Sequence, residues 1–77
     1  MQKEELMGYQ VFNRDTAKKV YEQEYHGKIS IFAILEKEGR YFLLKNCILD
    51  QEPYIVVVEK DVEEIDKNTF LNILLKK

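Results

Sequence analysis

The sequence contains few of the residue types that mark specialised protein classes. Among its 77 residues it has one cysteine, one proline, one histidine, three glycines and no tryptophan. A single cysteine excludes an intrachain disulfide framework and a cysteine-rich zinc module. The hydrophobic fraction of 45% and the aromatic fraction of 12% argue against a disordered tail. We therefore expect one small domain over residues 1–77.

The charge and hydropathy of the chain argue against further classes of protein. The formal net charge is −2, which is far from the basic footprint of a typical nucleic-acid binder. No apolar run is longer than that from Ile31 to Leu35, whereas a membrane-spanning helix needs about 20 apolar residues. The start of the chain, Met1 to Gly8, is charged, so we expect no signal peptide and a cytoplasmic protein. The excess of lysine over arginine suggests a bacterial or phage source with an AT-rich genome.

The first half of the chain has a helical pattern. The apolar residues repeat at positions i, i+3, i+4 and i+8, which are Ala17, Val20, Tyr21 and Tyr25. Good N-cap residues precede them in the segment 13–16, and Gly27 offers a helix end. We predict a helix over 14–26, with a strand at 17–25 as the alternative. Before it, Tyr9, Val11 and Phe12 could form a short strand or simply pack.

The middle of the chain is rich in β-branched and aromatic residues. Three segments read as strands, at 29–35, 41–46 and 54–59. Turns are expected at 36–40, where Gly39 allows a positive φ, and at 50–53, where proline fixes φ. Short connections between successive strands predict an antiparallel meander.

The end of the chain indicates a second helix. Asp61 and Glu64 resemble a capping box, and apolar residues continue at helical spacing to Leu74. One helix from 61 to 76 and a break at 66–68 with a helix at 68–76 are the two alternatives. The predicted fold class is α+β, with a three-stranded antiparallel β-meander flanked by an N-terminal and a C-terminal helix.

This α-β-β-β-α order is similar to that of the double-stranded-RNA-binding domain. The resemblance implies a second helix that opens on lysines and grips phosphates. Here the matching stretch, 61–66, is acidic and would repel phosphate. A nucleic-acid-binding function, supported by aromatic residues beside Arg40, therefore stays the disfavoured alternative.

Few side chains offer chemistry. His26 has no second histidine to share a metal, and Cys47 has no evident activating base. The acidic residues near the end of the chain lack the spacing and glycine of a calcium loop; they are Asp61, Glu63, Glu64 and Asp66. We therefore expect no catalytic residue, no metal site and no cofactor, and a protein that is not an enzyme.

The strongest functional signal is apolar residues on both faces of all three strands. A half-exposed antiparallel sheet has one polar face, and this pattern fails here. We predict a partner interface on the second face, formed by Phe32, Ile34, Phe42, Leu44, Ile55 and Val57. Such a face suits a small interaction module that acts as a homodimer or with another protein as regulator, inhibitor or accessory subunit. On this hypothesis Phe42→Glu should give a folded monomer.

Overall fold

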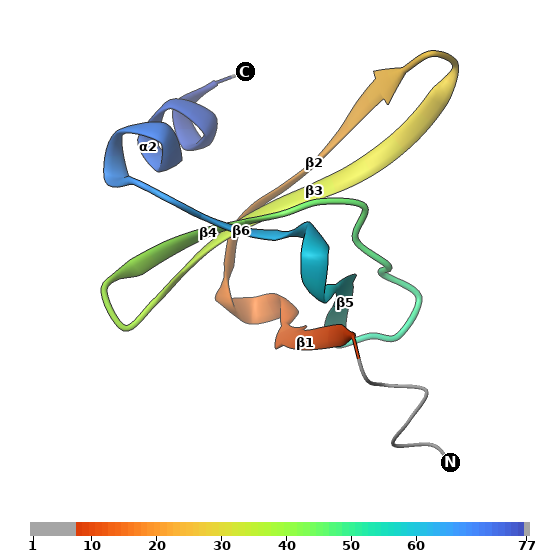
Figure 1. Cartoon of the computed structure of the whole chain (residues 1–77), viewed down its shortest axis with the longest axis horizontal. Helices are drawn as coiled ribbons and strands as arrows, with labels where there is room; N and C mark the ends of the chain where they lie inside the picture. The colour runs from red at the N-terminus through yellow and green to blue at the C-terminus, as the bar shows by residue number, and fades with distance from the viewer. Residues whose placement is uncertain (1–7, 77) are drawn as a thin grey trace.

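The computed structural model describes residues 8–76, which form six strands in two antiparallel sheets and one C-terminal helix (Figure 1). The strands are β1 (Tyr9–Asn13), β2 (Ala17–Tyr25), β3 (Lys28–Lys37), β4 (Arg40–Leu44), β5 (Tyr54–Val58) and β6 (Val62–Ile65). The helix, α2, spans Lys67–Leu75, and two 3₁₀ turns, η1 (Arg14–Thr16) and η2 (Glu59–Asp61), follow β1 and β5. Most of the charged N-terminal stretch, residues 1–7, and the last lysine lie outside the described residues.

The larger sheet has the strand order β2-β3-β4-β6, and the smaller sheet pairs β1 with β5. Two-residue turns join β2 to β3 and β3 to β4. Their residues, His26-Gly27 and Glu38-Gly39, have φ values of 53° and 79° in both turns. Positive φ at both positions is the geometry of a type I′ hairpin turn, in which glycine carries no Cβ penalty.

The hydrophobic core lies between the two sheets. We call the side of the larger sheet that faces the smaller one the core face. Leu35 lies opposite Phe42 on this face, and Ala33 lies opposite Leu44. The smaller sheet contributes two fully buried residues of β5, and the loop after β4 contributes Cys47. The buried core cluster is Ala33, Leu35, Leu44, Cys47, Ile55 and Val57.

Helix α2 packs on the opposite side of the larger sheet, which we call the helix face. Its apolar side chains Phe70, Ile73 and Leu74 follow helical spacing, and Phe70 is buried. The Phe70 ring lies with its centroid 4.6 Å from that of Tyr41. The helix starts where the Asp66 carboxylate accepts a hydrogen bond from the Thr69 backbone N–H at 2.8 Å, as an N-cap does.

The predicted helix at 14–26 is wrong. The turn η1 occupies its start, and the rest is strand β2, which has the bounds of the alternative, 17–25. Val20 packs against the core cluster, whereas Tyr21 stacks on Phe32 on the helix face. Val20 and Tyr21 are half-buried on opposite faces, and a bulge between Ala17 and Lys19 shifts the alternation, so the apolar residues of β2 match a helical repeat.

The single helix over 61–76 is also wrong, and the alternative with a break at 66–68 describes the chain better. Val62–Ile65 form β6, which pairs with β4, and the helix begins only at Lys67. Ile65 lies opposite Tyr41, and Val62 lies opposite Leu44. These cross-strand pairs outweigh the weak helical pattern of the acidic segment.

The three-stranded meander flanked by two helices is therefore contradicted. The strands at 29–35, 41–46 and 54–59 exist, but the third does not pair with the second. Strand β5 pairs with β1 instead, apart from an isolated bridge between Ile48 and Val56. The connection over 45–53 is long enough to carry the chain from the larger sheet to the smaller one. The α-β-β-β-α order, and with it the similarity to RNA-binding domains, is absent.

Candidate functional site

The six predicted interface residues do not form one face. Phe42 and Leu44 lie on the core face, whereas Phe32 and Ile34 lie on the helix face. Ile55 and Val57 belong to the other sheet. Four of the six have 0% exposure, namely Ile34, Leu44, Ile55 and Val57. The prediction assumed that the three strands are neighbours in one sheet. This assumption is wrong, because β5 belongs to the smaller sheet.

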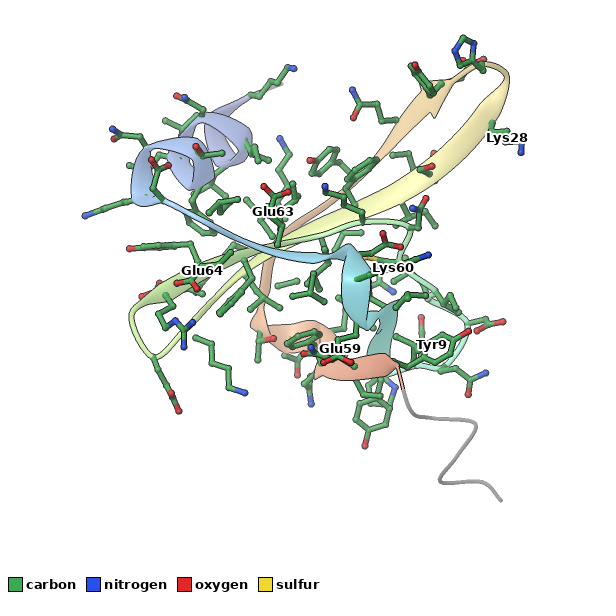
Figure 2. The ribbon with its side chains drawn as sticks, in the orientation of Figure 1. Tyr9, Lys28, Glu59, Lys60, Glu63 and Glu64 are labelled. Atoms are coloured by element: carbon green, nitrogen blue, oxygen red, sulfur yellow. The ribbon has the colours of Figure 1, made fainter. Side chains whose placement is uncertain are left out.

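The arm formed by β2 and β3 is the most open part of the structure. We define the arm as residues 22–31. Figure 1 shows it extending away from both α2 and the smaller sheet, and Figure 2 shows Lys28 at its tip. Tyr25 and Ile29 near the tip are 72% and 66% exposed. The arm therefore presents apolar side chains to its surroundings.

The outer edge of β2 has unpaired backbone groups. Strand β2 ends the larger sheet, and within residues 8–76 no backbone hydrogen bond joins 18–25 to a segment other than β3. A two-residue turn makes its flanking residues, Tyr25 and Lys28, a hydrogen-bonded pair, and bonding then alternates along the strand. The N–H and C=O groups of Val20, Glu22 and Glu24 consequently point away from β3.

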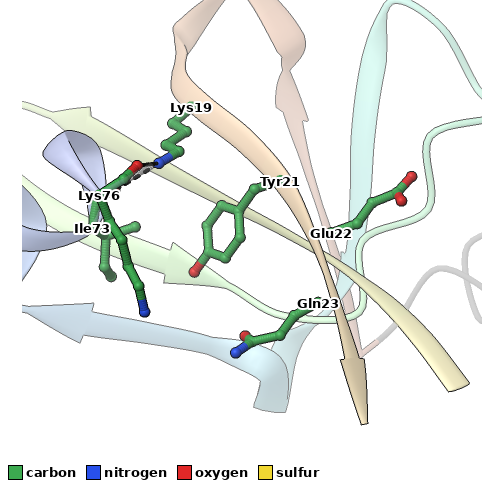
Figure 3. Close-up of a pocket in the computed structure, with 6 residues that line it drawn as sticks. All are labelled: Lys19, Tyr21, Glu22, Gln23, Ile73 and Lys76. Atoms are coloured by element: carbon green, nitrogen blue, oxygen red, sulfur yellow. Dashed lines mark hydrogen bonds between the residues drawn. The ribbon is translucent and has the colours of Figure 1, made fainter. Parts of the chain in front are cut away.

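A groove of about 430 Å³ lies beside this edge, between β2 and the end of α2 (Figure 3). It is lined by Lys19, Tyr21, Glu22, Gln23, Ile73 and Lys76. The Lys19 ammonium fixes one wall, because it donates a hydrogen bond to the Ile73 carbonyl at 2.9 Å and another to the Lys76 carbonyl. These carbonyls lie at the C-terminal end of α2, where a cation interacts favourably with the helix dipole.

A second hollow, of about 290 Å³, extends from the second half of β2 across β3 to the segment after β4. Gln23 lines both hollows. Phe32 contributes an aromatic ring to the second one, and the surrounding side chains are mostly polar, including Ser30, Lys45 and Asn46. The first hollow, which lies beside the open edge of β2, can accept side chains of an added strand.

The free cysteine is not poised for catalysis. Cys47 is buried, and burial together with the nearby Asp61 carboxylate raises the pKa of its thiol to about 11. The nucleophilic form of cysteine is the thiolate, which this environment disfavours at neutral pH. Its backbone N–H donates to the Ile31 carbonyl at 2.8 Å, which ties the loop to β3.

The histidine and the acidic residues have separate structural places. His26 sits in the β2–β3 turn rather than at a helix end, with its ring centroid 4.1 Å from that of Tyr25. Glu64 binds the Arg40 guanidinium through two contacts of 2.7 and 3.0 Å, and Glu63 binds Lys45 at 2.9 Å. Over residues 8–76, no group of three or more histidine, cysteine or carboxylate side chains could hold a metal ion.

Sequence reasoning missed the edge of β2 as a candidate site, because the preferred helix hid it. The signal was present in the alternative strand at 17–25. That segment has Lys18 and Lys19 in its first half and Glu22 and Glu24 in its second half, so its two charge signs are separated along one strand.

None of the helices found in residues 8–76 is long and apolar enough to cross a membrane. Comparison of the chain with protein-family models, with curated proteins and with solved structures finds no match.

Proposed function

We propose that this chain is a small protein-interaction module and that it binds an extended protein segment along the outer edge of β2. The observation that carries the proposal is a nine-residue edge strand whose outward backbone groups have no partner within residues 8–76, with a groove beside it. Addition of a strand to such an edge gives affinity through main-chain hydrogen bonds, and hollows for alternate side chains give specificity.

The opposite edge of the larger sheet is less suited to this role. Strand β6 has only four residues, and its two glutamates are engaged by Arg40 and Lys45. Very short edge strands are a common protection against unwanted pairing. The contrast between β2 and β6 supports the assignment of binding to β2.

The apolar tip of the arm gives the proposal a second support. Tyr25 is 72% exposed, which is more than any other tyrosine of the chain. Tyrosine is enriched in the centres of protein interfaces because it offers a large apolar ring and a hydroxyl group. A segment bound along β2 would cover this ring.

Photo-cross-linking in the cells that make the protein tests this function. A benzophenone amino acid replaces exposed Glu24 on β2 in one version of the full chain and exposed Lys60 in η2 in the control. The proposal predicts a discrete cross-linked protein product from position 24 and none from position 60. Absence of a product at position 24, or the same product from both positions, contradicts it.

A further inference from the structure

We propose that the segment bound by β2 is β2 of a second copy of this chain, paired antiparallel about a twofold axis at Tyr21. The inference rests on the proposed function and names its partner. Its basis is the charge order along the strand, the pattern of free backbone groups and the space beside the edge.

The charge order makes β2 complementary to itself. Charged residues on an edge strand usually prevent pairing with another chain. In β2, however, Lys18 and Lys19 stand at the start, whereas Glu22 and Glu24 stand in the second half. Antiparallel pairing of a strand with its own copy reverses this order, so the basic start of each strand meets the acidic half of the other.

The free backbone groups restrict the register. They belong to Val20, Glu22 and Glu24, so hydrogen-bonded pairs form only where an even-numbered residue meets another. With the axis at Tyr21, Val20 lies opposite Glu22 of the second copy. Lys18, which is exposed at the bulge between Ala17 and Lys19, lies opposite Glu24.

The alternative registers either leave part of β2 unpaired or place like charges opposite each other. Tyr21 is the midpoint of the nine residues Ala17–Tyr25, so an axis there pairs the whole strand. An axis at Glu22 would set the two Glu22 carboxylates directly opposite each other, and like charges in that position are destabilising. An axis at Val20 would leave Glu24 and Tyr25 without strand partners.

The groove at the end of α2 provides space for the partner on the helix face. In the Tyr21 register the two Tyr21 side chains lie opposite each other, and Lys19 lies opposite Gln23 of the second copy. These three residues already line the groove of about 430 Å³ together with Ile73 (Figure 3). Side chains of the second copy would enter this groove from the open side of β2.

The closing experiment reverses charges on the edge and measures association by sedimentation equilibrium at about 0.15 M salt. The proteins compared are the wild type, Lys18→Glu, Glu24→Lys and the double variant. Each single reversal places like charges opposite at two symmetric positions, so we expect the dimer dissociation constant to rise about tenfold. The double variant restores both attractions, and its dissociation constant should return to within about threefold of wild type.

Disulfide trapping tests the register directly. A mixture of Lys18→Cys and Glu24→Cys chains should form a cross-linked dimer under mild oxidation, because facing residues on neighbouring antiparallel strands lie about 4.5–5.5 Å apart between Cα atoms, within the range that a disulfide spans. Either chain alone should form much less. Both positions are exposed, and circular dichroism melting curves verify that every variant folds.

The outcomes separate this inference from the proposed function. A dimer that ignores all charge changes overturns pairing through β2 and points to another surface, such as the exposed Val11 and Tyr54 side chains of the smaller sheet. A wild type that stays monomeric at high concentration also overturns the inference. If position 24 then cross-links a different protein, the interaction module stands with another partner; if it cross-links nothing, both proposals fail.

Discussion

The ring of Tyr21 stacks on the ring of Phe32, with centroids 5.4 Å apart and planes inclined by 14°. The two residues lie directly opposite each other on β2 and β3. The Lys19 ammonium lies 5.6 Å from the Tyr21 ring centroid, and it also holds the end of α2. Tyr21 therefore connects the base of the arm to the region beside the helix.

Removal of this ring should destabilise the chain. We expect Tyr21→Ala to lower the free energy of unfolding by about 1–3 kcal/mol, because it loses both aromatic stacking and partial burial. Tyr21→Phe keeps the ring and should change that free energy by less than about 0.5 kcal/mol. Urea unfolding followed by circular dichroism measures both values. Equal losses in the two variants would show that the hydroxyl group, rather than the stack, supplies the stability.

Phe42→Glu should destabilise the fold rather than only change its association state. Phe42 packs against the core cluster, and the Arg40 guanidinium carbon lies 5.5 Å from its ring centroid. A carboxylate at this position would lie opposite Glu64 and compete for Arg40. We expect a loss of about 2–4 kcal/mol in the free energy of unfolding.

Leu71→Glu on α2 is the matched control, because Leu71 is 37% exposed and stands outside the core cluster. The same measurement should give a clearly smaller loss for this variant. If Phe42→Glu kept wild-type stability and became monomeric, the face that contains Phe42 would instead be an interface.

Strand positions were more predictable than strand partners. The three segments at 29–35, 41–46 and 54–59 are strands because β-branched and aromatic residues fill them, and this property is local. Whether 54–58 pairs with β4 or with β1 depends on the path of the connection 45–53. The local sequence pattern does not predict that path. The interface prediction inherited this error, since it required Ile55 and Val57 to share a face with Leu44.

The mistaken helix has a different cause. The bulge between Ala17 and Lys19 breaks the period of two in β2, and Val20 and Tyr21 are half-buried on opposite faces, so the apolar positions match a helical repeat. The turn residues after it were ambiguous too, because His26-Gly27 suits both a helix end and a type I′ hairpin. The cross-strand contact of Tyr21 with Phe32 favours the strand at 17–25 over the helix at 14–26, and this contact is not visible in the local sequence pattern.

The Cys47 thiol should react slowly with iodoacetamide in the native protein. With a pKa of about 11 against about 8.5 in an unfolded chain, its thiolate fraction at pH 8 is lower by about two orders of magnitude. Mass spectrometry of samples alkylated with and without denaturant measures the two rates. Rapid native alkylation near neutral pH would contradict the buried thiol and reopen a catalytic role for this residue.

The Asp66 cap should make the stability of the protein depend on pH. Hydrogen bonds from Thr69 lower the pKa of the Asp66 carboxyl from its ordinary value of 3.8. A lowered folded-state pKa means that the charged cap stabilises the protein above the unfolded-state pKa, and that this contribution disappears as the pH falls through the folded-state value. Asp66→Ala should therefore be less stable than wild type at pH 7, and this difference in stability should narrow as the pH falls below about 4.

Thermal unfolding of both proteins between pH 7 and pH 2 measures the gap in stability, with Asp66→Asn as the control that keeps a cap acceptor without the charge. A gap that stays constant across this range would show that the carboxylate charge contributes nothing to the start of the helix.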